Sequence, residues 1–114
     1  MTSREKALKG LRVIEIGSLI GGPFCGTLMS EFGAEVIKIE DPEVGDPARN
    51  LGKKIDETSS FFISLARNKR CITLDLRVPE GQRLFKRLVP LADVVLENFR
   101  PDTLRGWGLS LIHI

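Results

Sequence analysis

The chain has 114 residues, of which 42% are hydrophobic and 28% charged, and its formal net charge at pH 7 is +2. This composition supports the core of one domain, or part of one, and excludes a disordered chain. It gives no reason to expect a nucleic-acid partner, a membrane span or a metal site. The polar first ten residues lack the apolar segment of a secretory signal, so we expect a cytoplasmic protein.

Residues 12–40 predict a strand, a glycine-rich turn, a helix and a second strand. Arg12–Ile16 is short, apolar and bounded by glycines, and the helix begins near Gly21-Gly22-Pro23. Gly33 suits the position after the helix, where φ is positive. Such a unit implies parallel strands joined by a right-handed crossover. We expect one apolar stripe of the helix to face the core: Phe24, Cys25, Leu28, Met29 and Phe32.

Residues 41–70 are less regular. Prolines, glycine and acids predict a loop over residues 41–58, a length typical of functional or mobile segments. Ser59 and Ser60 are candidate caps of a short helix that ends at Ala66. Three acids match no calcium loop and are expected to be solvated: Asp41, Glu43 and Asp46. The basic turn at residues 67–70 either binds phosphate or is a solvated group of charges.

Residues 71–109 predict two more strands, each followed by a helix. Residues 71–76 alternate between apolar and polar, with Asp75 expected to pair with a nearby cation. A helix begins at Pro79, a strand covers residues 92–96 and a last short helix covers residues 101–107. The fold class is therefore α/β, a Rossmann-like, open and mostly parallel sheet with helices on both faces. Both cysteines, Cys25 and Cys71, are expected to pack as small hydrophobic residues.

Ligands of such sheets bind at the carboxyl ends of the strands. The first turn has no G-x-G-x-x-G spacing, which weighs against a nicotinamide- or flavin-binding domain without excluding it. Residues 97–100 follow the last strand and offer an amide, an aromatic face and a guanidinium in Asn98, Phe99 and Arg100. The alternative is a simple strand end with a buried phenylalanine.

Taken in order, these segments resemble the N-terminal part of the class III CoA-transferases, the CaiB/BaiF group. The resemblance covers about residues 8–109 and depends on eight segments: Leu11–Ile16, Gly22–Pro23, Phe32–Glu40, Gly45–Arg49, Asn68–Arg70, Ile72–Leu76, Ala92–Pro101 and Trp107–Leu109.

The resemblance implies a protein that moves coenzyme A between small carboxylic acids by way of an aspartyl intermediate. Acyl-CoA is then a substrate, with no tightly bound cofactor and no metal. The implied CoA contacts are Leu19, Ile20, Leu74, Asp75, Leu76, Arg77, Asn98, Phe99, Arg100 and Arg105. Two positions depart from the family, because Asp41 and Gly106 stand where some members carry arginine.

No aspartate of the chain matches the family's nucleophile, so we assign no catalytic residue and expect this chain alone to be inactive. Residues 1–109 are expected to be part of the CoA-binding domain, and residues 110–114 to be a tail unlike the family. The full-length parent is expected to be an interlocked homodimer. The alternatives are a fragment of an α-methylacyl-CoA racemase, an NAD(P)-type domain, or an inactive fragment that only binds a partner.

Overall fold

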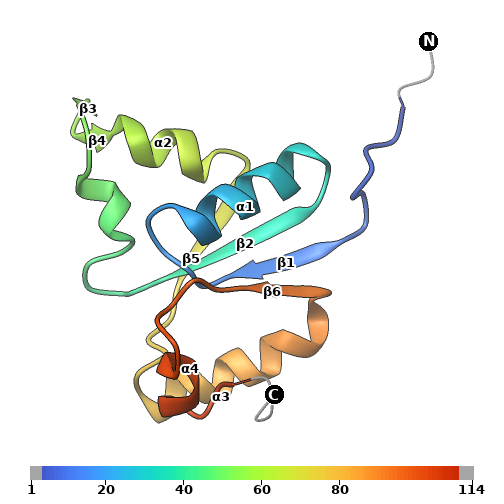
Figure 1. The fold of residues 1–114 in the computed structure, drawn as a ribbon, viewed down its shortest axis with the longest axis vertical. Coiled ribbons are helices and arrows are strands. Elements are labelled where there is room, and N and C mark those ends of the chain that lie inside the picture. The colour runs from blue at the N-terminus through green and yellow to red at the C-terminus, as the bar shows by residue number, and fades with distance from the viewer. Residues whose placement is uncertain (1–3, 111–114) are drawn as a thin grey trace.

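The structure is a computed structural model that describes residues 4–110. Its centre is a parallel sheet in the order β5-β2-β1-β6 (Figure 1). All three pairings are parallel, so the strands end at one common edge. The strands of this sheet are β1 (Arg12–Glu15), β2 (Glu35–Glu40), β5 (Lys69–Thr73) and β6 (Val94–Leu96).

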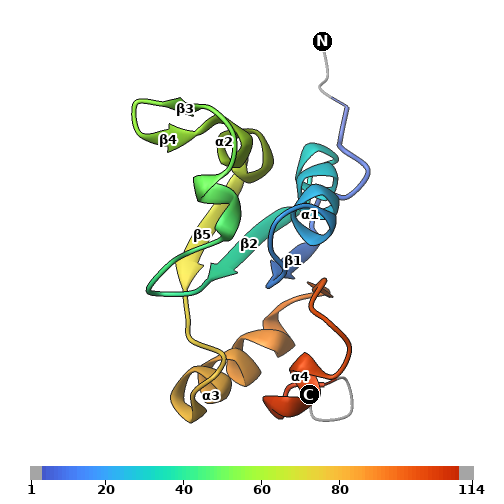
Figure 2. The same ribbon diagram turned by 60° about the vertical axis from the view of Figure 1, so that its left-hand side comes forward.

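Helices cover both faces of the sheet, which confirms the predicted fold class. Figure 2 shows α1 and α2 on one side of the strands and α3 and α4 on the other. Within residues 4–110, none of these helices is long and apolar enough to cross a membrane. The helices are α1 (Gly21–Glu31), α2 (Ser60–Ala66), α3 (Pro79–Leu88) and α4 (Thr103–Gly106), with 3₁₀ turns η1 (Pro47–Asn50) and η2 (Val89–Leu91).

The two faces of the sheet bury two separate apolar clusters. Neighbouring side chains of a strand point to opposite faces, so Val13 packs in one cluster and Ile14 in the other. The cluster on the α1 side is small and contains Val13, Ala34 and Val36. The cluster on the α3 side is larger and contains Ile14, Ile16, Ile39, Leu76, Phe85 and Leu109.

The predicted core face of α1 is wrong except at Met29, which packs against the cluster of Val13, Ala34 and Val36. Phe24, Leu28 and Phe32 are 52%, 44% and 56% exposed, and the buried residues are Gly22, Pro23, Gly26, Thr27 and Ser30. The cause is the close approach of the helix to the sheet. A Cβ on Gly26 would lie 2.0 Å from the Glu15 Oε1 atom, so only small residues fit there.

The prediction for the cysteines is also wrong, because Cys25 and Cys71 are both exposed. Cys25 lies on the outward side of α1, and Cys71 lies on β5 at the edge of the sheet. An edge strand covered little on either face gives its residues few apolar neighbours.

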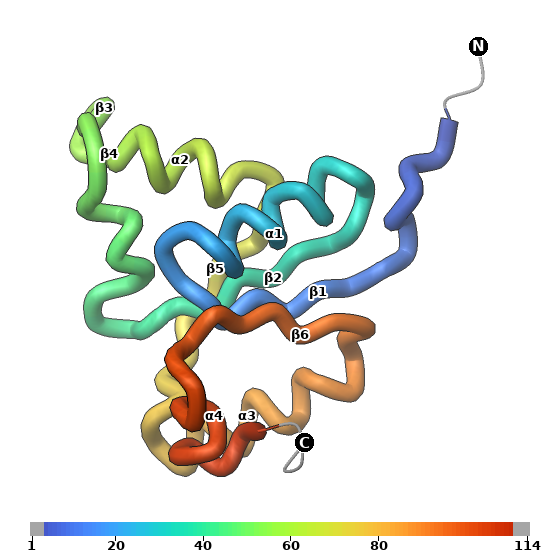
Figure 3. Tube along the Cα trace, viewed as in Figure 1, coloured from blue at the N-terminus to red at the C-terminus, as the bar shows by residue number. Residues whose placement is uncertain are grey.

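The third strand is displaced from its predicted range of residues 71–76. Pairing with β2 places Lys69 opposite Val36 and Thr73 opposite Glu40, and β5 ends there. The chain then crosses to the other face of the sheet (Figure 3). Leu76 is consequently buried in the cluster beside α3 and is not part of the strand.

The segment from residue 41 to residue 58 is irregular as predicted, except for η1 and a small hairpin of β3 (Lys54–Ile55) and β4 (Thr58–Ser59). Ser59 caps α2 by accepting a hydrogen bond from the Phe62 amide at 3.2 Å, as predicted. Gly33 has the predicted positive φ of 107°. Of the predicted tail, residues 111–114 lie outside the described residues.

Candidate functional site

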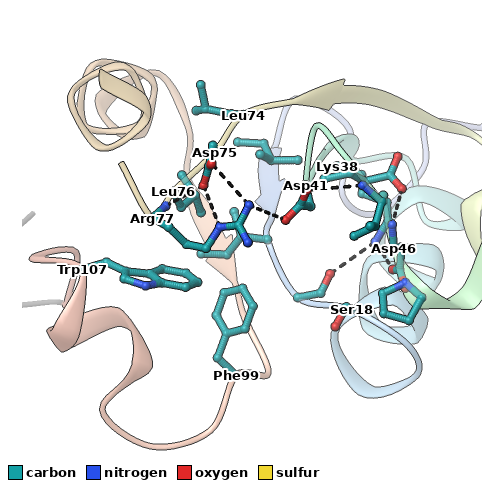
Figure 4. A pocket seen from close by; sticks show the side chains of 17 residues that line it. Ser18, Lys38, Asp41, Asp46, Leu74, Asp75, Leu76, Arg77, Phe99 and Trp107 are labelled. Carbon is teal, nitrogen blue, oxygen red and sulfur yellow. Dashed lines mark hydrogen bonds and ion pairs between the residues drawn. The ribbon is translucent and has the colours of Figure 1, made fainter. Parts of the chain in front are cut away.

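A cleft of about 230 Å³ opens at the edge where β1 and β2 end. One wall is the segment between β5 and α3, and another is the segment between β2 and η1 (Figure 4). The segment after β6 completes it. The cleft is lined by Ile16, Gly17, Ser18, Lys38, Ile39, Glu40, Asp41, Val44, Gly45, Asp46, Pro47, Leu74, Asp75, Leu76, Arg77, Phe99 and Trp107.

One side of the cleft is apolar and partly aromatic. Leu74 and Leu76 come from the segment after β5, and Phe99 and Trp107 come from the segments around α4. The two aromatic rings pack edge to face, with centroids 5.3 Å apart and planes at 75°. Such a surface suits a flat, apolar ligand group.

The rim of the cleft carries a charged trio of Asp41, Asp75 and Arg77. The Arg77 guanidinium is 2.8 Å from Asp41 Oδ2 through one nitrogen and 2.9 Å from Asp75 Oδ1 through Nε. The hydrogen bond from Arg77 lowers the pKa of Asp75 below its usual value. The expected pairing of Asp75 with a nearby cation is therefore confirmed.

Two residues at the floor of the cleft, Lys38 and Asp46, belong to a buried ionic network that extends to Glu15 and Lys69 beside α1. The centre of this network is Lys38. Its Nζ atom lies 2.8 Å from Glu15 Oε2, 2.7 Å from Asp46 Oδ2 and 3.3 Å from the Gly17 carbonyl oxygen. The contact with Asp46 has the geometry of an ion pair, not of a directed hydrogen bond. Burial acts to lower the pKa of Lys38, but its contacts with Asp46 and Glu15 outweigh burial and raise it.

Asp46 is buried, so the prediction that it is solvated is wrong. Its Oδ1 atom accepts hydrogen bonds from the Leu19 amide at 3.0 Å and the Ala48 amide at 2.9 Å. Leu19 has a positive φ of 66°, an uncommon conformation for a leucine. Asp46 therefore fixes the turn between β1 and α1 as well as the start of η1.

Asn98 fixes the same turn from the other side. Its Oδ1 accepts from the Ser18 amide, and its Nδ2 donates to the Ser18 carbonyl oxygen, both at 2.9 Å. A Cβ on Gly17 would lie 2.2 Å from this amide, so glycine is required for the contact. Asn98 does not line the cleft and acts on it through the turn.

The basic turn is a solvated group of charges at Arg67 and Arg70 but not at Lys69. Lys69 is buried, and its Nζ donates to Glu15 Oε1 at 2.6 Å and to the Pro23 carbonyl oxygen at 2.8 Å. Burial lowers the pKa of Lys69 more than Glu15 raises it. Arg67 and Arg70 pair with Glu31 and Glu35 at the surface.

The structure brings together some of the ten residues predicted to contact a ligand, and not others. Five of them line the cleft: Leu74, Asp75, Leu76, Arg77 and Phe99. Leu19 and Ile20 are exposed on the adjoining turn. Arg100 and Arg105 line a second, more open pocket that shares Phe99 with the cleft. Within the described residues, no three His, Cys, Asp or Glu side chains gather as metal ligands would.

Sequence reasoning missed Lys38, Asp46 and Trp107. The signal for Lys38 was a charge inside the apolar segment Val36–Ile39, opposite in sign to Glu15 in the neighbouring apolar segment. A buried charge requires a partner. Asp46 and Trp107 lie in irregular segments, where the sequence carries no signal of burial.

Comparison with known proteins identifies this architecture. The CoA-transferase family III model matches residues 8–113. A succinyl-CoA–D-citramalate CoA-transferase of Chloroflexus aurantiacus is 55% identical over 92% of this chain and 26% of its own length. A succinate–glutarate CoA-transferase of Agrobacterium fabrum is 41% identical over 96% of this chain and 29% of its own length.

Two solved structures also match this chain. A CaiB/BaiF family protein of Brucella suis matches with a TM-score of 0.86 and 38% identity, over 96% of this chain and 30% of that one. A Mycobacterium tuberculosis protein matches with a TM-score of 0.88 and 34% identity, over 97% of this chain and 31% of that one. The chain thus spans between a quarter and a third of the length of these proteins. It belongs to CoA-transferase family III.

Proposed function

We propose that this chain supplies the coenzyme A-binding cleft of a CoA-transferase. The observation that carries the proposal is the cleft itself, in which an apolar, aromatic wall lies beside Arg77 at the carboxyl edge of a parallel sheet, with Arg100 and Arg105 in the adjoining pocket. The strand order β5-β2-β1-β6 is that of a Rossmann-like half-sheet, in which ligands bind at this edge.

In this proposal the adenine of CoA packs against Leu74, Leu76, Phe99 and Trp107. Arginines favour phosphate because their planar fork forms charge-assisted hydrogen bonds with its oxygens. Those available around the cleft and the adjoining pocket are Arg77, Arg100 and Arg105. Leu19 and Ile20, exposed on the turn that Asp46 and Asn98 hold, contact the pantetheine portion.

The reaction is the transfer of CoA from an acyl-CoA to a small carboxylic acid. Relatives named for succinyl-CoA or succinate favour a dicarboxylic acyl donor such as succinyl-CoA. The acids at the cleft are all engaged by cations, so none is assigned as nucleophile: Glu40, Asp41, Asp46 and Asp75. The whole protein is proposed to be a cytoplasmic, interlocked homodimer, and this chain alone is expected to transfer no CoA.

Trp107 provides the test, since it is the chain's one tryptophan and lines the cleft. Titrating CoA into the chain is expected to change its intrinsic fluorescence in a saturable way. Phe99→Leu removes an aromatic face and is expected to weaken binding about fivefold or more. Phe32→Leu, an equal change at an exposed position directly after α1, is expected to have no effect.

NADH separates the proposal from a dinucleotide-binding domain, and we expect it not to bind. Saturable binding of NADH with an affinity equal to that of CoA would contradict the proposal. So would CoA binding that Phe99→Leu and Phe32→Leu weaken equally, because the cleft would then not be the site.

A further inference from the structure

The Arg77 guanidinium at the rim is occupied by carboxylates on two sides. Figure 4 shows it between Asp75, two residues earlier, and Asp41, which comes from the segment after β2. The ion pair with Asp41 therefore joins two walls of the cleft across its mouth. Two carboxylates face one guanidinium, so the trio as a whole carries a negative charge.

The two acids are bound differently. Asp75 accepts from Arg77 through the backbone amide at 2.9 Å, through Nε at 2.9 Å and through a terminal nitrogen at 3.3 Å. Asp41 meets Arg77 through a single contact of 2.8 Å. The contact with Asp41 is consequently the one that an incoming anion can replace.

Asp41 cannot move far when it is replaced. Its Oδ1 atom accepts from the Glu43 amide at 2.8 Å and the Val44 amide at 3.3 Å, and its carbonyl oxygen accepts from the Gly45 amide at 2.9 Å. This local turn keeps the carboxylate beside Arg77. A ligand phosphate at Arg77 would therefore meet a fixed negative charge.

We propose that Asp41 is a specificity-determining residue of the cleft, which competes with a ligand phosphate for Arg77 and so reduces the preference for a phosphorylated ligand. The inference rests on the proposed function, in which CoA occupies the cleft. The 3′-phosphate of CoA is absent from dephospho-CoA, and the two ligands otherwise match. The ratio of the dissociation constants of dephospho-CoA and CoA measures how much the 3′-phosphate strengthens binding.

Asp41→Asn is the direct test, because asparagine keeps an oxygen that can accept from the Glu43 amide while it removes the charge. The ratio of the dissociation constants of dephospho-CoA and CoA is expected to rise about fivefold in this variant, the size of one exposed ion pair. Glu43→Gln, in the same loop, is the matched control and is expected to raise the ratio much less than Asp41→Asn, because the charge of Glu43 acts on Arg77 more weakly than that of Asp41. In an Arg77→Gln background the gain from Asp41→Asn is expected to shrink.

Each possible result either supports or overturns the inference. A ratio that rises much more in Asp41→Asn than in Glu43→Gln supports the inference, and a ratio equal in Asp41→Asn and the parent chain overturns it while leaving CoA binding intact. An equal rise in Glu43→Gln also overturns it, because general loop charge would then be the cause. Failure of both the parent and Asp41→Asn to bind CoA overturns the proposed function, and the inference with it.

Discussion

Two charged clusters face the same cleft, and they differ in burial more than in chemistry. The floor network consists of Glu15, Lys38, Asp46 and Lys69, and the rim trio consists of Asp41, Asp75 and Arg77. The Lys38 side chain is 2% exposed, whereas the Arg77 side chain is 51% exposed. Both clusters have contacts of 2.6–2.9 Å, so distance alone does not distinguish them.

The difference in burial gives the floor network and the rim trio different roles. A buried charge has given up its hydration, so loss of its partner leaves an uncompensated ion in the interior. An exposed ion pair is screened by water and salt and is worth little to stability. The floor network therefore fixes the turn that carries Leu19, while the rim trio remains free to exchange partners with a ligand.

The largest effect is expected from Lys38→Met, which keeps much of the side-chain volume and removes the charge. Asp46 then loses its cation and Glu15 keeps only Lys69. We expect the free energy of unfolding to fall by about 3–5 kcal/mol. Urea unfolding followed by circular dichroism measures this change.

Arg70→Met is the matched control for that variant. Arg70 lies on β5, its side chain is 81% exposed, and its ion pair with Glu35 is 3.6 Å long. We expect its unfolding midpoint to be close to that of the parent chain. Equal losses in Lys38→Met and Arg70→Met would show that burial does not separate the two kinds of cluster.

A smaller loss of stability is expected at low pH. Burial acts to raise the pKa of Asp46, but Lys38 and the amides of Ala48 and Leu19 outweigh it and hold the pKa below its usual value. The pKa of Glu40 is lowered in the same way, since Arg49 and the Asp46 amide outweigh burial. A carboxyl whose pKa is lower in the folded state stabilises the fold above its unfolded pKa, about 4.

That stabilisation is lost as the pH falls through the lower, folded pKa values. We therefore expect the urea midpoint to decrease below about pH 4, and to decrease less steeply in Asp46→Asn, which has one fewer such carboxyl. Denaturation series at pH 7, 5 and 3 on both chains provide the comparison. Parallel pH profiles would show that Asp46 does not contribute.

Much of the fold could be predicted because hydrophobic periodicity records which residues face a core. The alternation of strands and helices gave the parallel sheet and the helices on both faces, as observed. The predicted core face of α1 was wrong except at Met29, because hydrophobic periodicity does not show how closely a helix approaches the sheet. Gly26 lies so close to Glu15 that the small side of the helix, not its apolar stripe, meets the sheet.

The floor network could be predicted only in part. Glu15 and Lys38 are charges inside apolar strands, which signals that each has a buried partner. Which residue is the partner depends on the strand register, since Glu15 lies opposite Lys38 in the pairing of β1 with β2. Asp46 and Lys69 join the network through tertiary contacts that no sequence spacing encodes.

The smallest effect on stability is expected from Arg77→Gln. The side chains of its partners Asp41 and Asp75 are 26% and 29% exposed, so water reaches them when the guanidinium is removed. We expect a thermal midpoint equal to that of the parent chain, together with weaker binding of CoA in the Trp107 fluorescence titration. A midpoint that falls as far as in Lys38→Met would mean that the rim holds the two walls of the cleft together, and the contrast between a structural floor and an exchangeable rim would not survive.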